Sequence, residues 1–318
     1  MQTTRGLSNM EFGIHLVQQN TTIEECRQLW RWADTAGFTW VDVSDHFYES
    51  PMTEKRGPYL ECLASLAALA VDTEHVRVGT CVLAMDYRHP AVLANALATI
   101  DHLAAGRLDV GLGAGWNVQE YSAYGIPFDR IGKRLDRLEE GIHVLRALWE
   151  EPEANYAGEY FQLADALCEP KPLQPRVPIW IGGVGERRTL QLVARYADGW
   201  NAPYLTVEDW QRLSSVLNEW CERVDRDPSE IQRDVNLSFH LAADEAARPR
   251  AQAHFEEVFG PAGDAFRQRG AIMGTPSEAL DILGPYAEAG VDRVNITLRP
   301  PWDWDALSAF ADEVIGQF

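Results

Sequence analysis

The sequence predicts a (β/α)₈ barrel, the TIM-barrel fold, with insertions in several of its loops. Short β-rich runs alternate with long amphipathic helical stretches along the 318 residues. Eight strand–helix units can be counted. Several of the strand runs are almost continuously apolar, as expected for parallel strands covered on both faces. This count favours a closed barrel, with an open doubly wound sheet as the alternative.

The eight expected strands are short apolar runs bounded by polar or glycine-containing turns. In chain order they are Phe12–Val17, Trp40–Val43, Arg77–Leu83, Leu108–Gly113, Pro178–Gly182, Gly199–Asn201, Val235–Leu241 and Arg293–Leu298.

Helices are expected between these strands, because apolar residues recur there at intervals of three and four and so share one helix face. Helix starts are indicated at residues 21–24 and 275–278, where threonine hydroxyls precede an early acidic residue. Glycines at positions typical of helix C-caps mark the ends. The clearest periodic runs are Leu93–Leu103, Ile131–Trp149 and Trp210–Val224, and the C-cap glycines are Gly37, Gly106 and Gly290.

Four stretches are too long for plain connections and are expected to carry function. Residues 44–59, 114–129 and the irregular segment 242–273 follow strands, so we expect them at the C-terminal rim of the barrel, where active sites of this fold lie. Residues 152–177 precede a strand instead, and we expect a hairpin at the bottom of the barrel. Residues 1–9 are interpreted as a leader and residues 10–318 as one domain.

Composition excludes several function classes. The formal charge of −20 leaves no basic stripe for a nucleic acid and disfavours an anionic membrane surface. No apolar run of about 18 residues is present, as a membrane-spanning helix would require. The five cysteines are scattered without a CxxC pair, which is typical of reduced thiols in a cytoplasmic protein. No GxSxG, Walker A or HxxxH motif is found, so no metal is expected.

A pair of polar residues, Asp45 and His46, follows the second expected strand. At a barrel strand end, such a pair supplies a proton near neutral pH and an acceptor that fixes neighbouring groups. The alternative is that Asp45 caps a turn and His46 is a rim residue.

Two glycine-rich segments follow the fourth and fifth expected strands. Gly111–Gly115 reads GxGxG and lacks the dinucleotide-binding pattern, but its glycines allow a flat ring to approach the backbone. Gly182–Thr189 precedes a helix and suits a phosphate through exposed N–H groups. The alternative for the second segment is a tight turn with ordinary surface arginines.

These motifs together resemble the luciferase-like oxidoreductases, which use flavin or deazaflavin, from Met10 to Phe318. The resemblance is carried by SDHF at 44–47, VGTCVL at 78–83, RHP at 88–90, GLGAGWNVQEYSAYGIPF at 111–128 and IWIGGVGERRTLQLVARYADGWN at 179–201. Within the family the sequence is most similar to the branch that uses coenzyme F420, a 5-deazaflavin.

The resemblance implies a set of site residues. His46 would be the catalytic proton donor, and a cis peptide at Cys81–Val82 would support the ring. Trp116 aligns where sugar-phosphate dehydrogenases of this branch carry a catalytic glutamate, which implies a less polar substrate bound beside Trp116. The implied cofactor-binding residues are Asp45, Cys81, Val82, Ala84, Gly113, Ala114, Gly115, Gln119, Gly182, Gly183, Val184, Gly185, Glu186 and Arg188.

The function implied is hydride transfer between the deazaflavin C5 and a small organic substrate, with F420 as cofactor. The alternatives are an FMN-dependent monooxygenase and a non-catalytic flavin-binding barrel. A homodimer is implied, without nucleic-acid or membrane partners. A local basic patch would offset the acidic charge near the cofactor; its candidates are Arg88, Arg130, Lys133, Arg134, Arg187 and Arg188.

Overall fold

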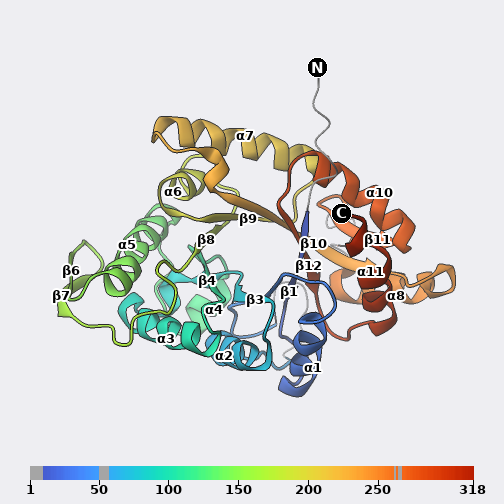
Figure 1. Cartoon of the computed structure of the whole chain (residues 1–318), viewed down its shortest axis with the longest axis horizontal. Helices are drawn as coiled ribbons and strands as arrows, with labels where there is room; N and C mark the ends of the chain where they lie inside the picture. Colours follow the sequence, from blue (N-terminus) through green and yellow to red (C-terminus); the bar gives the residue numbers. More distant parts are fainter. Residues whose placement is uncertain (1–9, 50–56, 261–262, 264–266) are drawn as a thin grey trace.

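The computed structural model describes residues 10–49, 57–260, 263 and 267–318, so the predicted leader, residues 1–9, lies outside the described residues. Eight parallel strands form a closed barrel with helices outside it, which confirms the predicted (β/α)₈ fold (Figure 1). The last barrel strand pairs with the first, with Arg293 beside Glu11, and so closes the ring. The barrel strands are β1 (Glu11–Leu16), β2 (Trp40–Val43), β3 (Arg77–Thr80), β5 (Leu108–Gly113), β8 (Ile179–Gly182), β9 (Gly199–Pro203), β10 (Gln232–Leu241) and β12 (Arg293–Leu298).

Two further parallel strands lie at the C-terminal end of the barrel. The third predicted strand is interrupted at residues 81–82 and resumes as β4 (Leu83–Ala84), which pairs with β5. Segment 242–273 was expected to be irregular, and this was wrong: it contains α8 (Arg248–Phe259) and reaches β11 (Ala271–Gly274), which pairs with β10. The helix buries only Phe255 and Phe259, so its sequence lacks the wide apolar stripe that identified the other helices.

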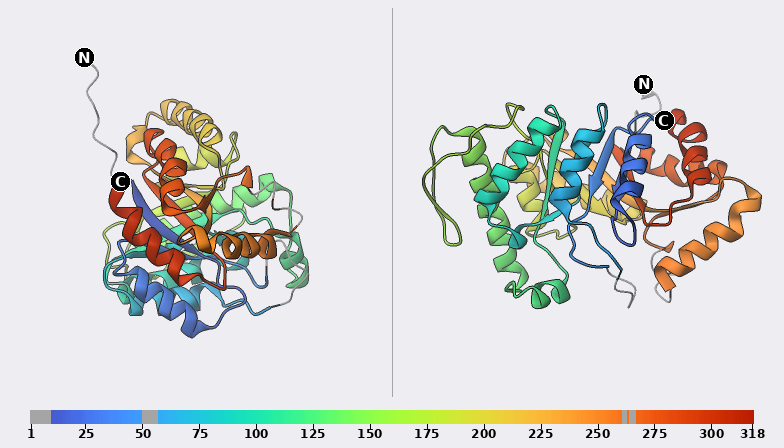
Figure 2. Two further views of the ribbon diagram at one scale, coloured as in Figure 1. Left: turned by 90° about the vertical axis from the view of Figure 1, so that its right-hand side faces the viewer. Right: turned by 90° about the horizontal axis from the view of Figure 1, so that it is seen from below.

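The remaining helices surround the barrel, and α8 projects at its edge (Figure 2). Both predicted helix starts are confirmed, since Thr22 and Thr275 form capping boxes with Glu25 and Glu278. Within the described residues, none of the helices combines the length and apolarity needed to cross a membrane. The helices are α1 (Ile23–Ala33), α2 (Cys62–Asp72), α3 (Pro90–Leu103), α4 (Val118–Ala123), α5 (Ile131–Glu150), α6 (Thr189–Tyr196), α7 (Val207–Arg223), α10 (Pro276–Glu288) and α11 (Trp304–Glu313), with 3₁₀ turns at Met85–Tyr87, Pro228–Glu230, Glu245–Ala247 and Ile315–Gln317.

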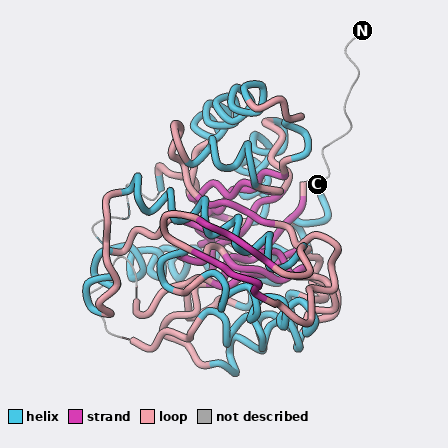
Figure 3. Tube along the Cα trace, turned by 90° about the vertical axis from the view of Figure 1, so that its left-hand side faces the viewer, coloured by secondary structure: helices cyan, strands magenta, loops and turns pink. Residues whose placement is uncertain are grey.

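The predicted hairpin within residues 152–177 is present as the antiparallel pair β6 (Ala154–Ala157) and β7 (Gln162–Ala166). It lies along the outer flank of α5 rather than beneath the barrel (Figure 3). The Glu140 carboxylate, midway along α5, accepts hydrogen bonds from the backbone N–H groups of residues 159–161 and fixes the hairpin tip there.

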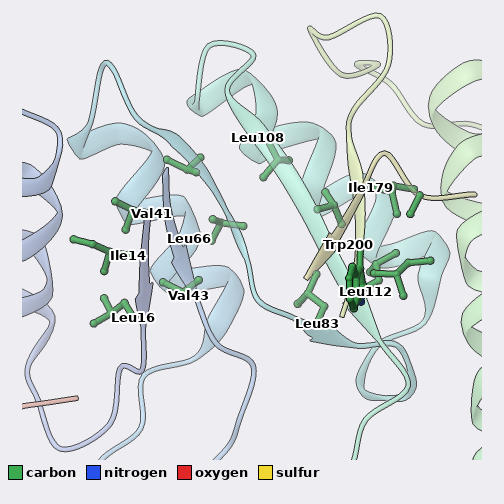
Figure 4. Packing of buried hydrophobic residues seen from close by; sticks show 14 of the residues in the cluster. Ile14, Leu16, Val41, Val43, Leu66, Leu83, Leu108, Leu112, Ile179 and Trp200 are labelled. Carbon is green, nitrogen blue, oxygen red and sulfur yellow. The ribbon is translucent and has the colours of Figure 1, made fainter. Parts of the chain in front are cut away.

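Apolar side chains fill the layer between strands and helices. Ile14 and Val41 point outward from β1 and β2, and Leu66 of α2 packs over the same layer (Figure 4). Because successive strand residues face opposite sides, the intervening positions point into the barrel. The outward layer is almost wholly apolar, and so the polar strand residues are directed inward.

The barrel interior is closed below the strand ends by a stack of three large side chains. The Arg293 guanidinium lies 4.2 Å from the ring centre of Trp40 and 4.6 Å from that of Trp180. Arg293 also donates to Asp234 at 2.8 Å. This stack forms a solid floor, and any ligand must therefore bind above it, toward the C-terminal ends of the strands.

Candidate active site

A cavity of about 460 Å³ lies at the C-terminal ends of the barrel strands. It is within the usual range for small-molecule and cofactor sites. Most of the residues implied by the family resemblance line it: Asp45, His46, Cys81, Val82, Ala84, Gly113, Ala114, Gly115, Trp116, Gly182 and Gly183. A second cavity of about 540 Å³ lies between α8 and α11, and among the described residues Arg299 alone lines both.

The rest of the predicted set lies outside this cavity. Gly183 and Thr189, the first residue of α6, both line the cavity, but the turn residues 184–188 between them do not. There Arg188 donates to Asp136 at 2.7 Å and Glu186 accepts from Arg212 at 2.6 Å. Gln119 is exposed at the start of α4. Val184 and Gly185 are also exposed, so for these five residues cofactor binding stays a prediction without a contact to the cavity.

The break between β3 and β4 is a cis peptide at Cys81–Val82, as predicted. The Val82 side chain occupies the space left by two glycines: a Cβ atom at Gly113 or Gly182 would lie 2.7 or 2.9 Å from it. These glycines are therefore required by Val82 itself. Burial raises the pKa of the Cys81 thiol, which stays protonated and donates to Asn201 Oδ1 at 3.3 Å.

Asp45 is fully engaged by the protein. Arg88 donates to both of its carboxylate oxygens, and the backbone N–H of Ala84 donates to one of them at 3.0 Å. The carboxylate thus ties the end of β2 to β4 and to the loop before α3. This geometry supports the fixing of neighbouring groups that was expected of Asp45.

His46 has a different partner, Glu120 of α4. The two side chains meet at 2.9 Å, between His46 Nδ1 and Glu120 Oε2. Glu120 is completely buried and also accepts from the Phe47 amide and the Tyr87 hydroxyl, each at 2.7 Å. Burial opposes ionisation of this carboxyl, but the bonds from His46, Phe47 and Tyr87 outweigh it, so the pKa of Glu120 is lower than usual.

Sequence reasoning missed Glu120, although it lies within the quoted motif at 111–128. Its only sequence signal is an acidic residue on the inward face of a short helix. Trp116, half-exposed at the cavity mouth, packs edge-on to the His46 ring with centroids 5.4 Å apart. The His46 ring is therefore fixed from two sides.

A second buried pair, also missed, lies deeper in the cavity. His15 Nδ1 is 2.6 Å from Asp42 Oδ1, and Trp40 donates to the other oxygen of Asp42 at 2.9 Å. Within the described residues, His15, Asp42 and Cys81 form the one group with metal-ligand spacing, their donor atoms within 4.8 Å of one another. Because both Asp42 oxygens already accept hydrogen bonds, this arrangement is explained as a structural network.

The predicted basic patch does not form at the cavity. Arg88 is neutralised by Asp45 and Glu61, and the buried Arg134 donates to the Gly115 carbonyl at 2.9 Å. The cations that do line the cavity are Arg269 and Arg299. Among the described residues neither has an acidic group within 4.0 Å; Arg299 donates to the Tyr204 hydroxyl at 3.3 Å. They come from loops beyond β10 and β12, which the sequence does not connect with the other site residues.

The fold and this cavity define a TIM-barrel protein with a cavity of small-molecule size at the C-terminal ends of its strands. The sequence model of the luciferase-like monooxygenase family matches residues 10–293, and the chain belongs to this family.

Named relatives are consistent with this membership. The chain is 30% identical to the F420-dependent glucose-6-phosphate dehydrogenase of Intrasporangium calvum, covering 89% of this chain and 91% of that protein. It is 38% identical over 141 residues to an uncharacterized protein of Mycobacterium tuberculosis, and there the match spans about half of each protein, 44% of this chain and 49% of the other. The structure of an F420-dependent secondary alcohol dehydrogenase in complex with an F420–acetone adduct has the same fold, with a TM-score of 0.85 at 19% identity over 96% of this chain and 98% of that one.

Proposed function

We propose that the protein is an F420-dependent oxidoreductase that transfers a hydride between the deazaflavin and a small organic substrate. The observation that carries the proposal is His46, which lies at the wall of a backbone-lined cavity with one ring nitrogen bonded to a buried carboxylate. Relatives that match most of the chain and are named F420-dependent enzymes support the choice of cofactor.

The cavity fits a deazaflavin in shape and in donor chemistry. The Cys81–Val82 backbone and the apolar Leu135 and Leu138 offer surfaces for the two faces of a flat ring system. Asn201 and Asn236 supply polar groups at its inner end, and Arg269 and Arg299 supply charge for an anionic group at its outer end. These residues would hold the cofactor. When bound, a deazaflavin supplies hydride acceptance or donation at C5.

The contribution of this chain is orientation and one proton. The ring-binding surfaces and Trp116 hold the substrate against the reacting carbon, so that a bimolecular step becomes effectively intramolecular. His46 gives a proton to the substrate oxygen or nitrogen during reduction, or takes it during oxidation. Asp45 keeps the peptide units that line the cavity in place through Ala84 and Arg88.

Trp116 guides the proposal on substrate class. Sugar-phosphate dehydrogenases of the resembling branch carry a glutamate at the aligned position, and here the position holds an indole beside His46. We therefore propose a substrate less polar than a sugar phosphate, such as an enone, an imine or an alcohol. Replacing Trp116 with alanine should raise KM for such a substrate more than it changes cofactor affinity.

The cofactor proposal is tested by titrating the purified protein with F420 and with FMN, each followed by fluorescence. Saturable F420 binding that is tighter than FMN binding supports it. Tighter FMN binding without F420 saturation would overturn it and favour an FMN-dependent monooxygenase, the alternative suggested by the family's name. Cofactor binding without turnover of any tested alcohol, imine or enone would favour a non-catalytic barrel.

We also propose a cytoplasmic homodimer without nucleic-acid partners. The adjacent helices α2 and α3 contain no lysine, arginine or glutamate, and they expose Val71, Val92 and Leu103 by 59%, 69% and 43%. Such a neutral apolar surface suits a second copy of the same surface. Val92→Glu should shift the sedimentation coefficient to that of a monomer, and Val118→Glu, a change at an exposed valine on α4, should not.

A further inference from the structure

We propose that Glu120 is a positioning residue that sets the tautomer of His46 and the orientation of its ring. The proposal rests on the proposed function, because it concerns the group that is to exchange a proton with the substrate. It assigns to α4 a role that neither the fold nor the family match specifies.

The hydrogen bonds at Glu120 determine its charge. Its two oxygens accept from the Phe47 N–H and the Tyr87 hydroxyl at 2.7 Å, and from the Tyr48 N–H at 3.4 Å. A backbone N–H is always a donor, and a carboxylate is only an acceptor. Burial raises the pKa of Glu120, but these bonds together with the one from His46 lower it further, so the group is ionised.

An ionised Glu120 leaves one arrangement for the imidazole. At 2.9 Å from a carboxylate oxygen, Nδ1 of His46 must carry a hydrogen and donate it. The exchangeable proton is therefore on Nε2, for which the described residues provide no hydrogen-bond partner, and the ring lines the cavity. In the neutral ring Nε2 is an acceptor, and in the charged ring it is a donor.

The groups around His46 leave Glu120 as the one that fixes its tautomer. Asp45 is the other nearby carboxylate, but the Arg88 guanidinium is bonded to both of its oxygens. Tyr59 and Trp116 present ring edges to the imidazole, at centroid distances of 6.0 and 5.4 Å. Glu120 thus contributes the one ionised carboxylate in direct contact with His46 among the described residues.

A purely structural role would give a different result. Glu120 also ties the loop after β2 to α4, because it accepts hydrogen bonds from the Phe47 and Tyr48 amides. If this were its only role, replacing the carboxylate with an amide would not change which imidazole nitrogen of His46 carries the proton. Glu120→Gln and Glu120→Asp separate the two roles, because the amide retains an acceptor for the loop and the shorter acid retains the charge. Tyr87→Phe is the matched control, since it removes a different donor from the same carboxylate.

The test is ¹⁵N-histidine NMR of the cofactor-free protein, with the His46 signals assigned by their absence in His46→Gln. In the wild type we expect the neutral ring with its proton on Nδ1. In Glu120→Gln the Nδ1-protonated tautomer should lose its dominance, because the amide can present its NH₂ group to Nδ1 as well as its oxygen. Glu120→Asp should restore this tautomer at least in part, and Tyr87→Phe should retain it.

An unchanged tautomer in a folded Glu120→Gln would overturn the proposal. If the glutamine variant fails to fold, a wild-type imidazole that carries its proton on Nε2 would overturn it instead. Because the measurement needs no cofactor, it is independent of the F420 titration. If the wild-type protein does not bind F420, the proposed function is wrong, but the role assigned to Glu120 still stands.

Discussion

Arg88 and Asp45 form a two-point ion pair, with the Arg88 Nη1 and Nη2 atoms 2.8 and 2.9 Å from the two carboxylate oxygens. Only 1% of the Asp45 side chain and 18% of the Arg88 side chain are exposed. Because the same carboxylate accepts the N–H of Ala84, the pair joins three strand-end segments at the cavity wall. Asp45, which the family resemblance implied to be a cofactor-binding residue, thus has a structural role: it holds these segments together.

Asp45→Asn should destabilise the protein by about 3–5 kcal/mol, because it leaves a largely buried guanidinium without its main counter-charge. The measurement is urea unfolding. Asp303→Asn is the matched control: Asp303 forms a similar two-point pair with Arg250, but the pair is exposed and its loss should cost about 1 kcal/mol or less. Equal losses in the two variants would show that burial of the Asp45 pair is unimportant.

His46→Ala should leave F420 affinity nearly intact and lower turnover by about 10²–10⁴-fold, the usual contribution of a general acid or base. The change is measured as kcat with saturating cofactor, beside an F420 titration. His75→Ala, at an exposed histidine, serves as the control and should match the wild type. Full turnover in His46→Ala would assign His46 a structural role at the rim.

Gly183→Ala should weaken F420 binding by about tenfold or more, equivalent to ~1.4 kcal/mol. Gly183 lines the cavity with a φ of 128°, and a Cβ there would lie 3.3 Å from the Thr189 side chain. Gly106→Ala is the control for backbone strain, since Gly106 has a φ of 81°, lies outside the cavity, and a Cβ there would make only an ordinary contact with Gln174 at 3.6 Å. Both variants should lose stability, but an equal loss of affinity would trace the effect to strain alone.

Asp72→Asn should reduce stability at neutral pH by about 1–3 kcal/mol, as expected for hydrogen bonds to a charged group. Bonds from Arg27 foremost, then Arg31 and Trp30, hold the pKa of Asp72 well below its usual value. A lowered pKa contributes stability that is present above about pH 4 and is lost as the pH falls further.

The difference in unfolding free energy between the wild type and Asp72→Asn should therefore be constant from pH 7 to about pH 5 and shrink at lower pH. Solvent screening of the two partly exposed arginines keeps the effect modest. Asp281→Asn, at an exposed position on α10, should show no such pH dependence. A difference that grows on acidification would contradict the sign of the shift.

All eight barrel strands could be predicted from the sequence because each is a short run with apolar residues on its outward side, bounded by polar or glycine-containing turns. The segment with α8 and β11 could not, since its apolar residues are few and its strand is only Ala271–Gly274. The same limit applies to the site. Asp45 and His46 follow a strand in the sequence, whereas Glu120 lies on α4 and contacts His46 only through the closure of the barrel.

The glycines within the strands show a further limit of predicting structure from sequence patterns. Gly113 was interpreted as allowing a flat ring to approach the backbone, and Gly182 as part of a phosphate-binding turn. In the structure both line the cavity and also make room for Val82. A side chain that faces the backbone of another strand leaves no periodic signal. Its position depends on which strands become neighbours, and the order of the strands is a property of the closed sheet.

The floor of the barrel constrains the order in which its residues can change during evolution. Gly13 and Gly79 lie against Trp40, and Gly199 lies against Trp180, so closely that a methyl group at any of them would overlap an indole ring. At Gly199, where the nearest atoms all belong to Trp180, a mutation that enlarges the glycine first is sterically blocked, whereas a mutation that shrinks Trp180 first leaves a cavity that a larger residue can later fill. Arg293, held between the two rings, would lose its contact surface in that intermediate. We therefore expect that, during evolution, a smaller aromatic residue replaces the tryptophan before a larger residue replaces the glycine.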